Sequence, residues 1–478
     1  MINQLKQKKN NSELLVFTVI LACGFFMRLF SLINSDNFHG IAAGKIFEAR
    51  YLLKHPEELW AWIVPAHGPV HLYLIAILFK IFGDYIIIAR LISLFSGVAL
   101  FFPYYKLIKL SFSRDIALFS CFIAAFFYLH VIYSVISTAE SIFILFLFSG
   151  LYFYFKYFQS QRVFELIISA LCVGVSSMCR FEGGLYIVLL SAFLIKKPKI
   201  MLIFLISSCM LPWVWIVFNF ILYGDFFYFL TSSDNIVKYE FDNLKVYGTQ
   251  YTITERILYW PMVLKGYFGN ILFIFGIIGL WSNFRNAKTK LLLVLFLSIL
   301  GFFIFKTFYK ELAMQPRYGL SLGCLFIPFI ADALLTGYTR VKKISKNLIL
   351  ARDQFKMLFF LILFYIVIRG SYLSLVQLPH TPLWVEKTAK FLAANVDENK
   401  NELVYIDSDD DNFIEPIKIL SGLDVDSFVD MQAEGTHKEL IESASLKNIK
   451  YRILISKTRN LNLKQIFQAS DCKIYKIK

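Results

Sequence analysis

Residues 138–158 read TAESIFILFLFSGLYFYFKYF, and this stretch decides the fold. No charged residue occurs between Glu140 and Lys156, and the residues between them are almost all apolar. A helix of about 20 such residues crosses the ~30 Å hydrocarbon layer of a bilayer. Similar runs recur along the 478 residues, of which 58% are hydrophobic and 17% charged, and the mean hydropathy is +0.60. This composition is outside the usual range of soluble proteins and predicts an integral membrane protein.

The apolar runs predict an all-α polytopic membrane protein with about eleven transmembrane helices. The run from Leu14 follows a basic stretch, but it is long and has no convincing cleavage site, so it is interpreted as the first span and not as a signal peptide. Residues 68–83 are apolar but short, and they predict an interfacial helix. The spans are expected near residues 14–33, 85–108, 116–135, 140–158, 163–180, 183–196, 200–222, 262–284, 289–308, 317–338 and 357–376.

The charge pattern predicts the orientation. The formal net charge is +15, yet residues 380–478 hold 14 Lys and Arg against 16 Asp and Glu, so the positive excess lies between the apolar runs. Cytoplasmic loops carry such an excess, which removes most of the case for nucleic-acid binding. A cytoplasmic N-terminus puts every basic cluster on one side and leaves residues 34–84, 223–261, the turns before Glu140 and Glu182, and the tail outside. We therefore expect a multi-pass protein of the inner (plasma) membrane.

After Pro379 the composition becomes that of a soluble protein. The chain is therefore divided into a transmembrane domain, 1–378, and a small non-cytoplasmic α/β domain, 379–478. No phosphate loop, metal-ligand spacing or nucleophile motif occurs in the second. We assign it no catalysis and expect it to be dispensable for the transfer step itself. Its expected helices are 384–394, 413–421 and 437–444, and its expected strands are 403–407, 451–456 and 473–477.

The chemistry is expected on the outer side, where acidic residues border the spans. Asp36 and His39 follow the first span, and a carboxylate there suits proton abstraction or a divalent ion. The alternative is that Asp36 caps a helix beginning near Gly40. Glu140 begins a helix, where acidic residues are favoured whatever the function. Arg180 and Glu182 form a second hairpin of this kind, and their mutual pairing is a sufficient structural explanation for both.

Basic residues on the outer side run against the topological bias. Arg317 and Tyr318, in Gln315-Pro-Arg-Tyr318, precede a late span, and Lys310 lies nearby. Arginine binds phosphate oxygens bidentately, so a lipid-linked phosphate and ordinary lipid headgroups are both suitable partners. His67 and His71 are four residues apart at the start of the interfacial helix. No third metal ligand is visible, which favours pocket lining over metal binding.

The order of these motifs resembles the GT-C superfamily of polyprenyl-phosphate-dependent glycosyltransferases. The segments that carry the resemblance are HGPVHLYLIAILFKIFGDYIIIARLISLFSG, TAESIFILFLFSGLYFYFKYF, MCRFEGGLYIVLL, NFILYGDFFYFL and QPRYGLSLG, within residues 14–340. The chain looks like the branch that holds the dolichyl-phosphate-mannose protein mannosyltransferases and the lipid A aminoarabinose transferases.

The resemblance implies roles for individual residues. Asp36 corresponds to the family's catalytic acid, Glu140 to a second acid, and Arg317 with Tyr318 to the pair near the donor phosphate. Many relatives have Asp-Glu where this chain has Asp36 followed by Asn37, which puts the division of labour between Asp36 and Glu140 in doubt. The implied reaction is inverting transfer from a polyprenyl-phosphate sugar, with Arg317 and Arg180 stabilising the departing phosphate.

Two other classes share many spans. A lipid or solute transporter or flippase would show internal repeats and broken helices, and no repeat is visible here. A scaffold that presents the C-terminal domain would not bring Asp36, Glu140 and Arg317 to one cavity. The sequence leaves open the sugar, the acceptor (glycan, lipid or protein), a divalent cation and the oligomeric state.

Overall fold

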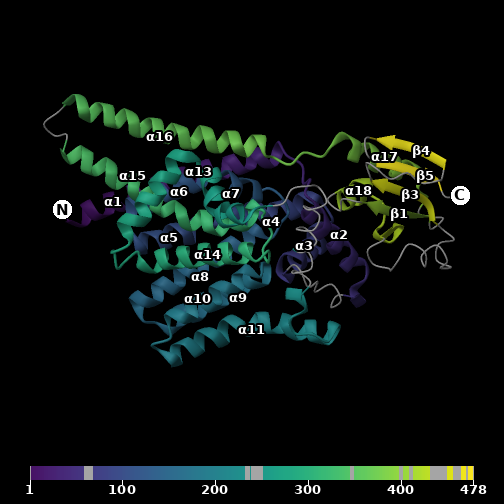
Figure 1. Ribbon diagram of the computed structural model, residues 1–478, viewed down its shortest axis with the longest axis horizontal. Helices are drawn as coiled ribbons and strands as arrows, with labels where there is room; N and C mark the ends of the chain where they lie inside the picture. The colour runs from purple at the N-terminus through teal and green to yellow at the C-terminus, as the bar shows by residue number, and fades with distance from the viewer. Residues whose placement is uncertain are drawn as a thin grey trace.

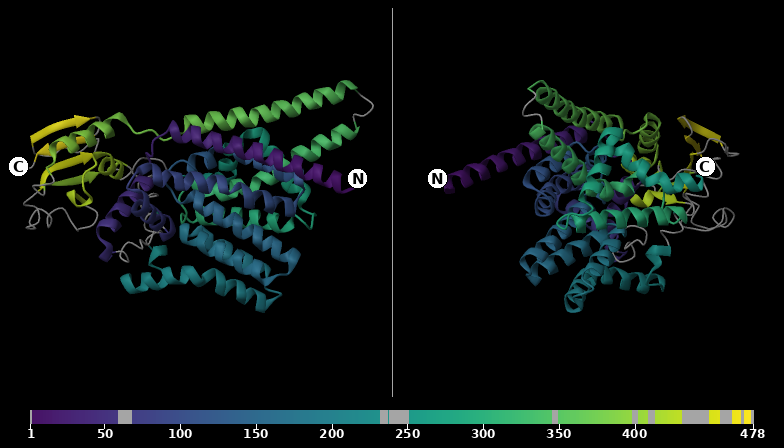
Figure 2. Two further views of the ribbon diagram at one scale, coloured as in Figure 1. Left: turned by 180° about the vertical axis from the view of Figure 1, so that it is seen from behind. Right: turned by 60° about the vertical axis from the view of Figure 1, so that its left-hand side comes forward.

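The computed structural model describes residues 2–58, 68–231, 237, 251–344, 349–397, 402–408, 413–430, 449–455, 464–469 and 472–476. Helices run alongside one another in an elongated bundle, and a small sheet lies at one end (Figure 1). The start of the first helix lies at the opposite end of the molecule, as both views of Figure 2 show. We call the end of the bundle next to the sheet the sheet end.

Eight helical stretches in the described part of the chain are long and apolar enough to cross a membrane. Large apolar side chains are exposed along several of them, as expected for surfaces that face lipid. The chain is therefore a polytopic membrane protein. The helices that form these stretches are α1 (Ile2–Ile33), α4 (Ile86–Ala99) with α5 (Phe101–Ser111), α8 (Glu140–Ser160), α11 (Pro198–Tyr223), α13 (Ile253–Asn283), α14 (Lys290–Phe308), α15 (Leu320–Ile344) and α16 (Ile349–Val376).

The segment 116–135, predicted as a single span, is not one continuous helix. The segment forms two helices, α6 (Arg114–Ala125) and α7 (Tyr128–Tyr133). The break between them frees backbone carbonyls, and Arg28 of α1, which is fully buried, donates to the carbonyls of Ala124 and Ala125. Its Nη2 also lies 2.6 Å from Nδ1 of His130. An interruption of this kind is tolerated at membrane depth because protein groups satisfy the freed backbone.

Helix α13 begins earlier than expected and is kinked. It starts at Ile253 instead of near 262, and Gly269 has φ 74°, which only glycine adopts without strain. Arg369 of α16 donates to the carbonyl of Gly266, 2.7 Å away, close to this kink. A side chain from a neighbouring helix thus satisfies the backbone next to both interruptions, at Phe126 and at Gly269.

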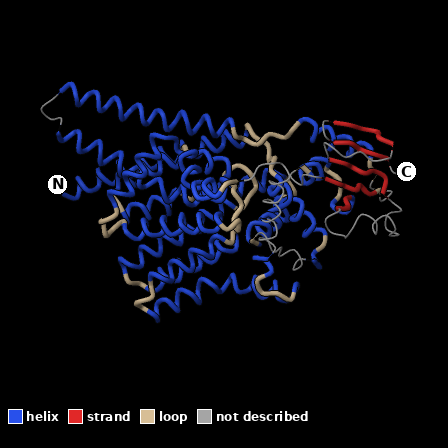
Figure 3. The backbone as a smooth tube through the Cα atoms, in the orientation of Figure 1, coloured by secondary structure: helices blue, strands red, loops and turns tan. Residues whose placement is uncertain are grey.

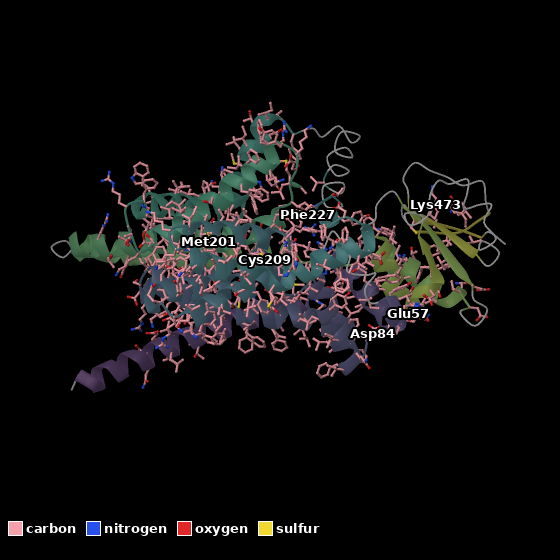
Figure 4. The ribbon with its side chains drawn as sticks, turned by 90° about the horizontal axis from the view of Figure 1, so that it is seen from below. Glu57, Asp84, Met201, Cys209, Phe227 and Lys473 are labelled. Carbon is pink, nitrogen blue, oxygen red and sulfur yellow. The ribbon has the colours of Figure 1, made fainter. Side chains whose placement is uncertain are left out.

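Two shorter apolar helices and two interfacial ones complete the bundle. The predicted spans 163–180 and 183–196 appear as α9 (Val163–Cys179) and α10 (Glu182–Phe193). The first outer segment forms α2 (Gly40–Lys54), the turn η1 (Pro56–Glu58) and α3 (Pro69–Phe82), at the sheet end. Glu57 and Asp84 are seen in Figure 4 at this border, whereas Met201 lies farther along the bundle.

In its described residues, the C-terminal domain is a five-stranded mixed sheet with two helices, and it has its own apolar core. The sheet order is β2-β1-β3-β5-β4, with β1 parallel to β2 and β3, and β5 antiparallel to β3 and β4. The strands gather at one end of the molecule (Figure 3). The elements are α17 (Leu383–Asn395), α18 (Ile414–Ser421), η5 (Val425–Ser427), β1 (Leu403–Ser408), β2 (Phe428–Asp430), β3 (Ile449–Ile455), β4 (Lys464–Ala469) and β5 (Cys472–Lys476).

Most elements predicted for this domain correspond to observed helices and strands, but strands β2 and β4 were not predicted. Strand β2 has only three residues, and β4 alternates polar and apolar side chains only weakly. The helix predicted over 437–444 lies outside the described residues.

The C-terminal domain docks on helix α2. Lys54 forms ion pairs with Asp424 at 2.5 Å and with Asp426 at 2.6 Å. Nε2 of His55 lies 3.0 Å from a carboxylate oxygen of Asp426. The rings of Phe47 and Phe428 are in edge contact beside this charged cluster. We call Lys54, His55, Asp424 and Asp426 the docking cluster.

Candidate active site

A buried ion triad joins three helices at the sheet end. Arg180, the residue after α9, donates to Glu140 at the start of α8, 2.5 Å away, and to Glu182 at the start of α10, 2.6 Å away. Both carboxylates are less than a tenth exposed. Burial alone would lower the pKa of Arg180, but the carboxylates of Glu182 and Glu140 outweigh it and raise this pKa. Arg180 is thus a fixed cation, and it is paired with Glu182 as the sequence suggested.

Two glycines allow the helices around this triad to approach closely. A Cβ on Gly183 would lie 2.5 Å from the backbone nitrogen of Ser177, so α10 packs directly on the end of α9. A Cβ on Gly68 would lie 1.9 Å from the carbonyl oxygen of Met178, two residues before Arg180. The glycine of His67-Gly68-Pro69 therefore lets α3 approach the triad.

Tyr318 connects the triad to a second arginine. Arg180 and Arg317 both contact its ring, and their guanidinium carbons are 4.9 and 5.2 Å from the ring centroid. The loop that carries it is held by α13, because Tyr259 donates to the carbonyl of Met314 and Tyr267 to that of Pro316. Arg317 and Tyr318 are therefore presented by a fixed loop, as a preorganised site requires.

Arg317 lines a cavity of about 360 Å³, which we call the arginine cavity. Among the described residues no carboxylate pairs with Arg317, and its buried Nε has no hydrogen-bond partner. Such an arginine is suited to an anion, because an unpaired buried donor is costly. The polar residues around the cavity are His39, Tyr133, Gln315 and Gln377.

His39 lies where α2 begins and is neutral at pH 7. Burial and the positive charge of Arg317 lower its pKa to about 4, although Glu140 acts in the opposite direction. Its ring meets that of Tyr133 edge-on, with the centroids 6.4 Å apart. A neutral imidazole here can exchange hydrogen bonds with a sugar hydroxyl without adding charge.

Asp36 lines a second cavity, of about 380 Å³, which we call the interdomain cavity. Its Oδ2 accepts a hydrogen bond from the backbone N–H of Thr381, 2.9 Å away, and its own N–H donates to the carbonyl of Pro379. Helix α2 has His39 as its N-cap, so Asp36 does not cap it, and the capping interpretation is wrong. The carboxylate is exposed.

The two cavities are neighbours, separated by the segments around Asp36 and Pro379. Residues 36–38 line the interdomain cavity, and His39 lines the arginine cavity. Asn37 accepts from the N–H of Ser137, which ties this segment to the turn before Glu140. Arg90 of α4 fixes the same region by donating to the carbonyls of Leu32 and Val135 and to the hydroxyl of Ser35.

The remaining predicted residues divide as follows. His71 is 1% exposed, and neither of its ring nitrogens has a hydrogen-bond partner among the described residues. Burial and, to a lesser extent, the positive charge of Lys45 lower its pKa to about 3. Lys310 is exposed and lines neither cavity. His67 lies outside the described residues. The residues brought together are thus Glu140, Arg180, Glu182, Arg317, Tyr318 and His39. Asp36, Glu140 and Arg317 do not line one cavity, because Asp36 lines the adjoining one and Glu140 lines neither, so the expected convergence of these three residues is wrong.

Several residues of the site were missed from the sequence. Tyr133, Gln315 and Gln377 carry no motif, and only the fold brings them to Arg317. Arg90 was not singled out, although an arginine within an apolar run is a signal in itself. Within the described ranges, no group of three or more His, Cys, Asp and Glu could hold a metal ion.

Comparison with known proteins shows which family part of the chain resembles. Residues 66–222 match the family model of the dolichyl-phosphate-mannose-protein mannosyltransferases. No curated protein sequence matches the chain significantly. The family match covers about a third of the chain, and it agrees with the resemblance to the GT-C glycosyltransferases.

Particular solved structures share the fold. The ArnT protein of Cupriavidus metallidurans bound to undecaprenyl phosphate is similar over 96% of this chain and 97% of its own, with a TM-score of 0.63 and 11% identity. The apo state of the same protein has a TM-score of 0.61 and 13% identity, over 98% of each chain. The oligosaccharyltransferase of Archaeoglobus fulgidus, in complex with zinc and sulfate, has a TM-score of 0.60 and 12% identity, over 92% of this chain and 67% of its own.

Proposed function

We propose that this chain transfers a sugar from a polyprenyl-phosphate-linked donor to an acceptor hydroxyl, with inversion at the anomeric carbon. The observation that carries the proposal is Arg317, an arginine without a carboxylate partner among the described residues, which faces the arginine cavity from a fixed loop. The ArnT structure of the same fold is described as bound to undecaprenyl phosphate, which supports a lipid-linked phosphate as the anion.

The geometry suggests a role for each group. The acceptor oxygen attacks the anomeric carbon, its proton passes to Asp36, and the bond from that carbon to the phosphate oxygen breaks. The phosphate leaves with its charge stabilised by Arg317, which is held over the ring of Tyr318. Glu140 and Glu182 hold Arg180, and their burial in the triad suits them to positioning more than to contact with an acceptor.

The proposal includes an orientation in the membrane. The N-terminus lies in the cytoplasm, and both cavities and the C-terminal domain lie on the non-cytoplasmic side. In support, the start of α1 and the sheet are at opposite ends of the molecule (Figure 1). Single cysteines at Asp225 and Lys387 should react with a membrane-impermeant maleimide in intact cells. Reaction only after permeabilisation would reverse the orientation.

The test of the reaction uses the purified chain with undecaprenyl-phosphate-linked sugars. Release of undecaprenyl phosphate, measured by mass spectrometry, should require the lipid-linked donor. Consumption of a nucleotide sugar instead would contradict the proposal. The transporter alternative is not favoured, since the family model and the fold matches are to transferases.

A further inference from the structure

A partly exposed arginine lies within a membrane span and lines neither the arginine cavity nor the interdomain cavity. Arg369 is on α16, about 10 Å along the helix from the end of the span at Val376. It donates to the carbonyl of Gly266, and its buried Nε has no hydrogen-bond partner among the described residues. An arginine at this depth is costly unless its donors are paired. The donors that Gly266 leaves free therefore call for a further acceptor.

A second cation accompanies this arginine. Lys265 is exposed on α13 and directly precedes Gly266, the residue that accepts from Arg369. Within the described ranges, no carboxylate pairs with either of the two cations. Lys306, in the last turn of α14, is by contrast paired with Glu311 at 2.6 Å. We call Arg369 and Lys265 the basic pair.

Two glycines fix the position of the arginine. A Cβ on Gly269, at the kink of α13, would lie 3.1 Å from Nε of Arg369. A Cβ on Gly370 would lie 2.1 Å from the carbonyl oxygen of Phe126, so α16 packs closely on the break between α6 and α7. The guanidinium is thus held between the two helix interruptions, and little of its freedom is left to lose when a ligand binds.

The space behind the arginine is too small for a ligand. Arg369, Phe126 and Tyr267 are among the residues that line a cavity of about 20 Å³. A cavity of this size holds about one water molecule. A partner of the basic pair therefore stays on the outer surface of α13 and α16. A lipid-linked donor, whose phosphate has to reach Arg317, has no room to enter the bundle through this space.

The surface around the basic pair is apolar and faces lipid. Met262 lies one helical turn from Lys265, and Tyr372 lies one turn from Arg369. Both side chains are more than half exposed, at 53% and 62%. Tyrosine is enriched at the level of the lipid headgroups, where its ring contacts acyl chains and its hydroxyl reaches water. An anion that carries acyl chains fits this surface better than a soluble one.

We propose that the basic pair binds the phosphate of an anionic glycerophospholipid, from the membrane leaflet at the sheet end. Arg369 donates to the phosphate through the nitrogens that Gly266 leaves free, and Lys265 adds a second positive charge. The bound lipid bridges α13 and α16 beside the kink. Gln377, eight residues after Arg369, lines the arginine cavity, so the lipid also supports one wall of the candidate active site.

The experiment uses the full-length chain in phosphatidylethanolamine nanodiscs. Phosphatidylglycerol and phosphatidylcholine, each with a diazirine near the headgroup end of the same acyl chain, are the probes. Phosphatidylglycerol should label α13 and α16 about fivefold more than phosphatidylcholine. Lys265→Gln and Arg369→Gln should each lower its labelling about fivefold. Lys306→Gln is the matched control, because it removes a cation that is already paired, and it should label as wild type.

Lys265→Gln keeps the hydrogen bond from Arg369 to Gly266, so it tests the site even where Arg369→Gln does not fold. Equal labelling by the two probes, or the same loss in Lys306→Gln as in Lys265→Gln, overturns the proposal. Undecaprenyl phosphate, added at one tenth of the probe concentration, should not displace phosphatidylglycerol. Displacement would make the basic pair part of the donor's route instead. Displacement by millimolar glycerol 3-phosphate would assign the pair to a soluble anion and overturn the proposal as well.

Discussion

Asp36 is an exposed carboxylate with one oxygen fixed by the N–H of Thr381, at the boundary between two cavities. Asp36→Asn keeps an oxygen that can accept this hydrogen bond but cannot take a proton. If Asp36 is the base, turnover should fall on the order of 10²-fold or more with donor binding roughly retained. The assay is product formation from an undecaprenyl-phosphate sugar. Near-normal turnover in this variant would rule out the proposed base.

Arg317 gives the second prediction for a single residue. Arg317→Lys keeps the charge but loses the planar fork that binds phosphate and the stacking on Tyr318, so donor affinity and rate should both fall. Lys310→Ala is the matched control, because Lys310 is a neighbouring cation that is exposed and outside both cavities. Titration of the donor separates the two variants. Loss of donor affinity in Lys310→Ala without loss in Arg317→Lys would point instead to general electrostatic attraction.

Single residues of the site were predictable where a charge interrupts an apolar pattern. Arg180, Glu140 and Arg317 stand out for this reason, and the structure brings them together. The assignment of Asp36 to a separate cavity was not predictable, because it depends on Pro379 and Thr381, more than 340 residues along the chain. Lys310 shows the opposite case. It is close to Arg317 in the sequence, but the fold leaves it exposed and outside both cavities.

Adjacent glycines of α10 test how the helices hold the ion triad. A Cβ at Gly183 meets backbone atoms of Ser177, whereas a Cβ at Gly184 meets nothing within 4 Å. Gly183→Ala should therefore lower stability by about 1–3 kcal/mol and displace Glu182. Gly184→Ala should be neutral or stabilising by up to about 1 kcal/mol, since alanine favours a helix. Thermal unfolding of the purified variants makes the comparison, and equal midpoints would contradict the close packing.

The existence of the long helices followed from their apolar length, but their interruptions did not. Residues 116–135 contain no Asp, Glu, Lys, Arg, Gly or Pro, so neither a charge nor a helix breaker marks the break at Phe126. The signal lies instead in Arg28, about a hundred residues earlier, whose burial needs acceptors that an intact helix does not offer. The kink at Gly269 is likewise accompanied by Arg369 from another helix.

At the scale of the whole molecule, docking of the C-terminal domain should depend on pH. The hydrogen bond to Asp426 raises the pKa of His55, so the docked state favours the protonated imidazole. This contribution is complete below the pKa of a free imidazole, about 6.5, and is lost as the pH rises through the raised value. The other charged groups that face His55 are Glu57 and, through Asp426, Lys54.

Hydrogen–deuterium exchange of α18, corrected for intrinsic rates, should therefore increase between about pH 6 and about pH 8.5. His55→Gln should remove most of this change while leaving the exchange of α9 as it was. A pH effect of the same size in His55→Gln would assign it to other groups. The effect is expected to be modest, because the pairs of the docking cluster are partly exposed.

The overall architecture was largely predictable, because composition separates a membrane part from a soluble tail at Pro379. The interdomain cavity was not predictable, because no sequence pattern in the membrane part or in the tail indicates which of their surfaces meet. Lys54 and Asp424 are ordinary surface residues in the sequence, and only the fold pairs them across 370 positions.

Arg28 also constrains how the chain is made. Its partner His130 follows 102 residues later, so the first helix must enter the bilayer long before its guanidinium can be satisfied. At about 5–20 residues per second, ribosomes need on the order of 5–20 seconds to supply α6 and α7. During that time α1 carries an arginine whose placement in lipid costs about 2.5–3.5 kcal/mol. The nascent helix must therefore stay where water or the insertion machinery can solvate this group, and it joins the bundle when α7 arrives.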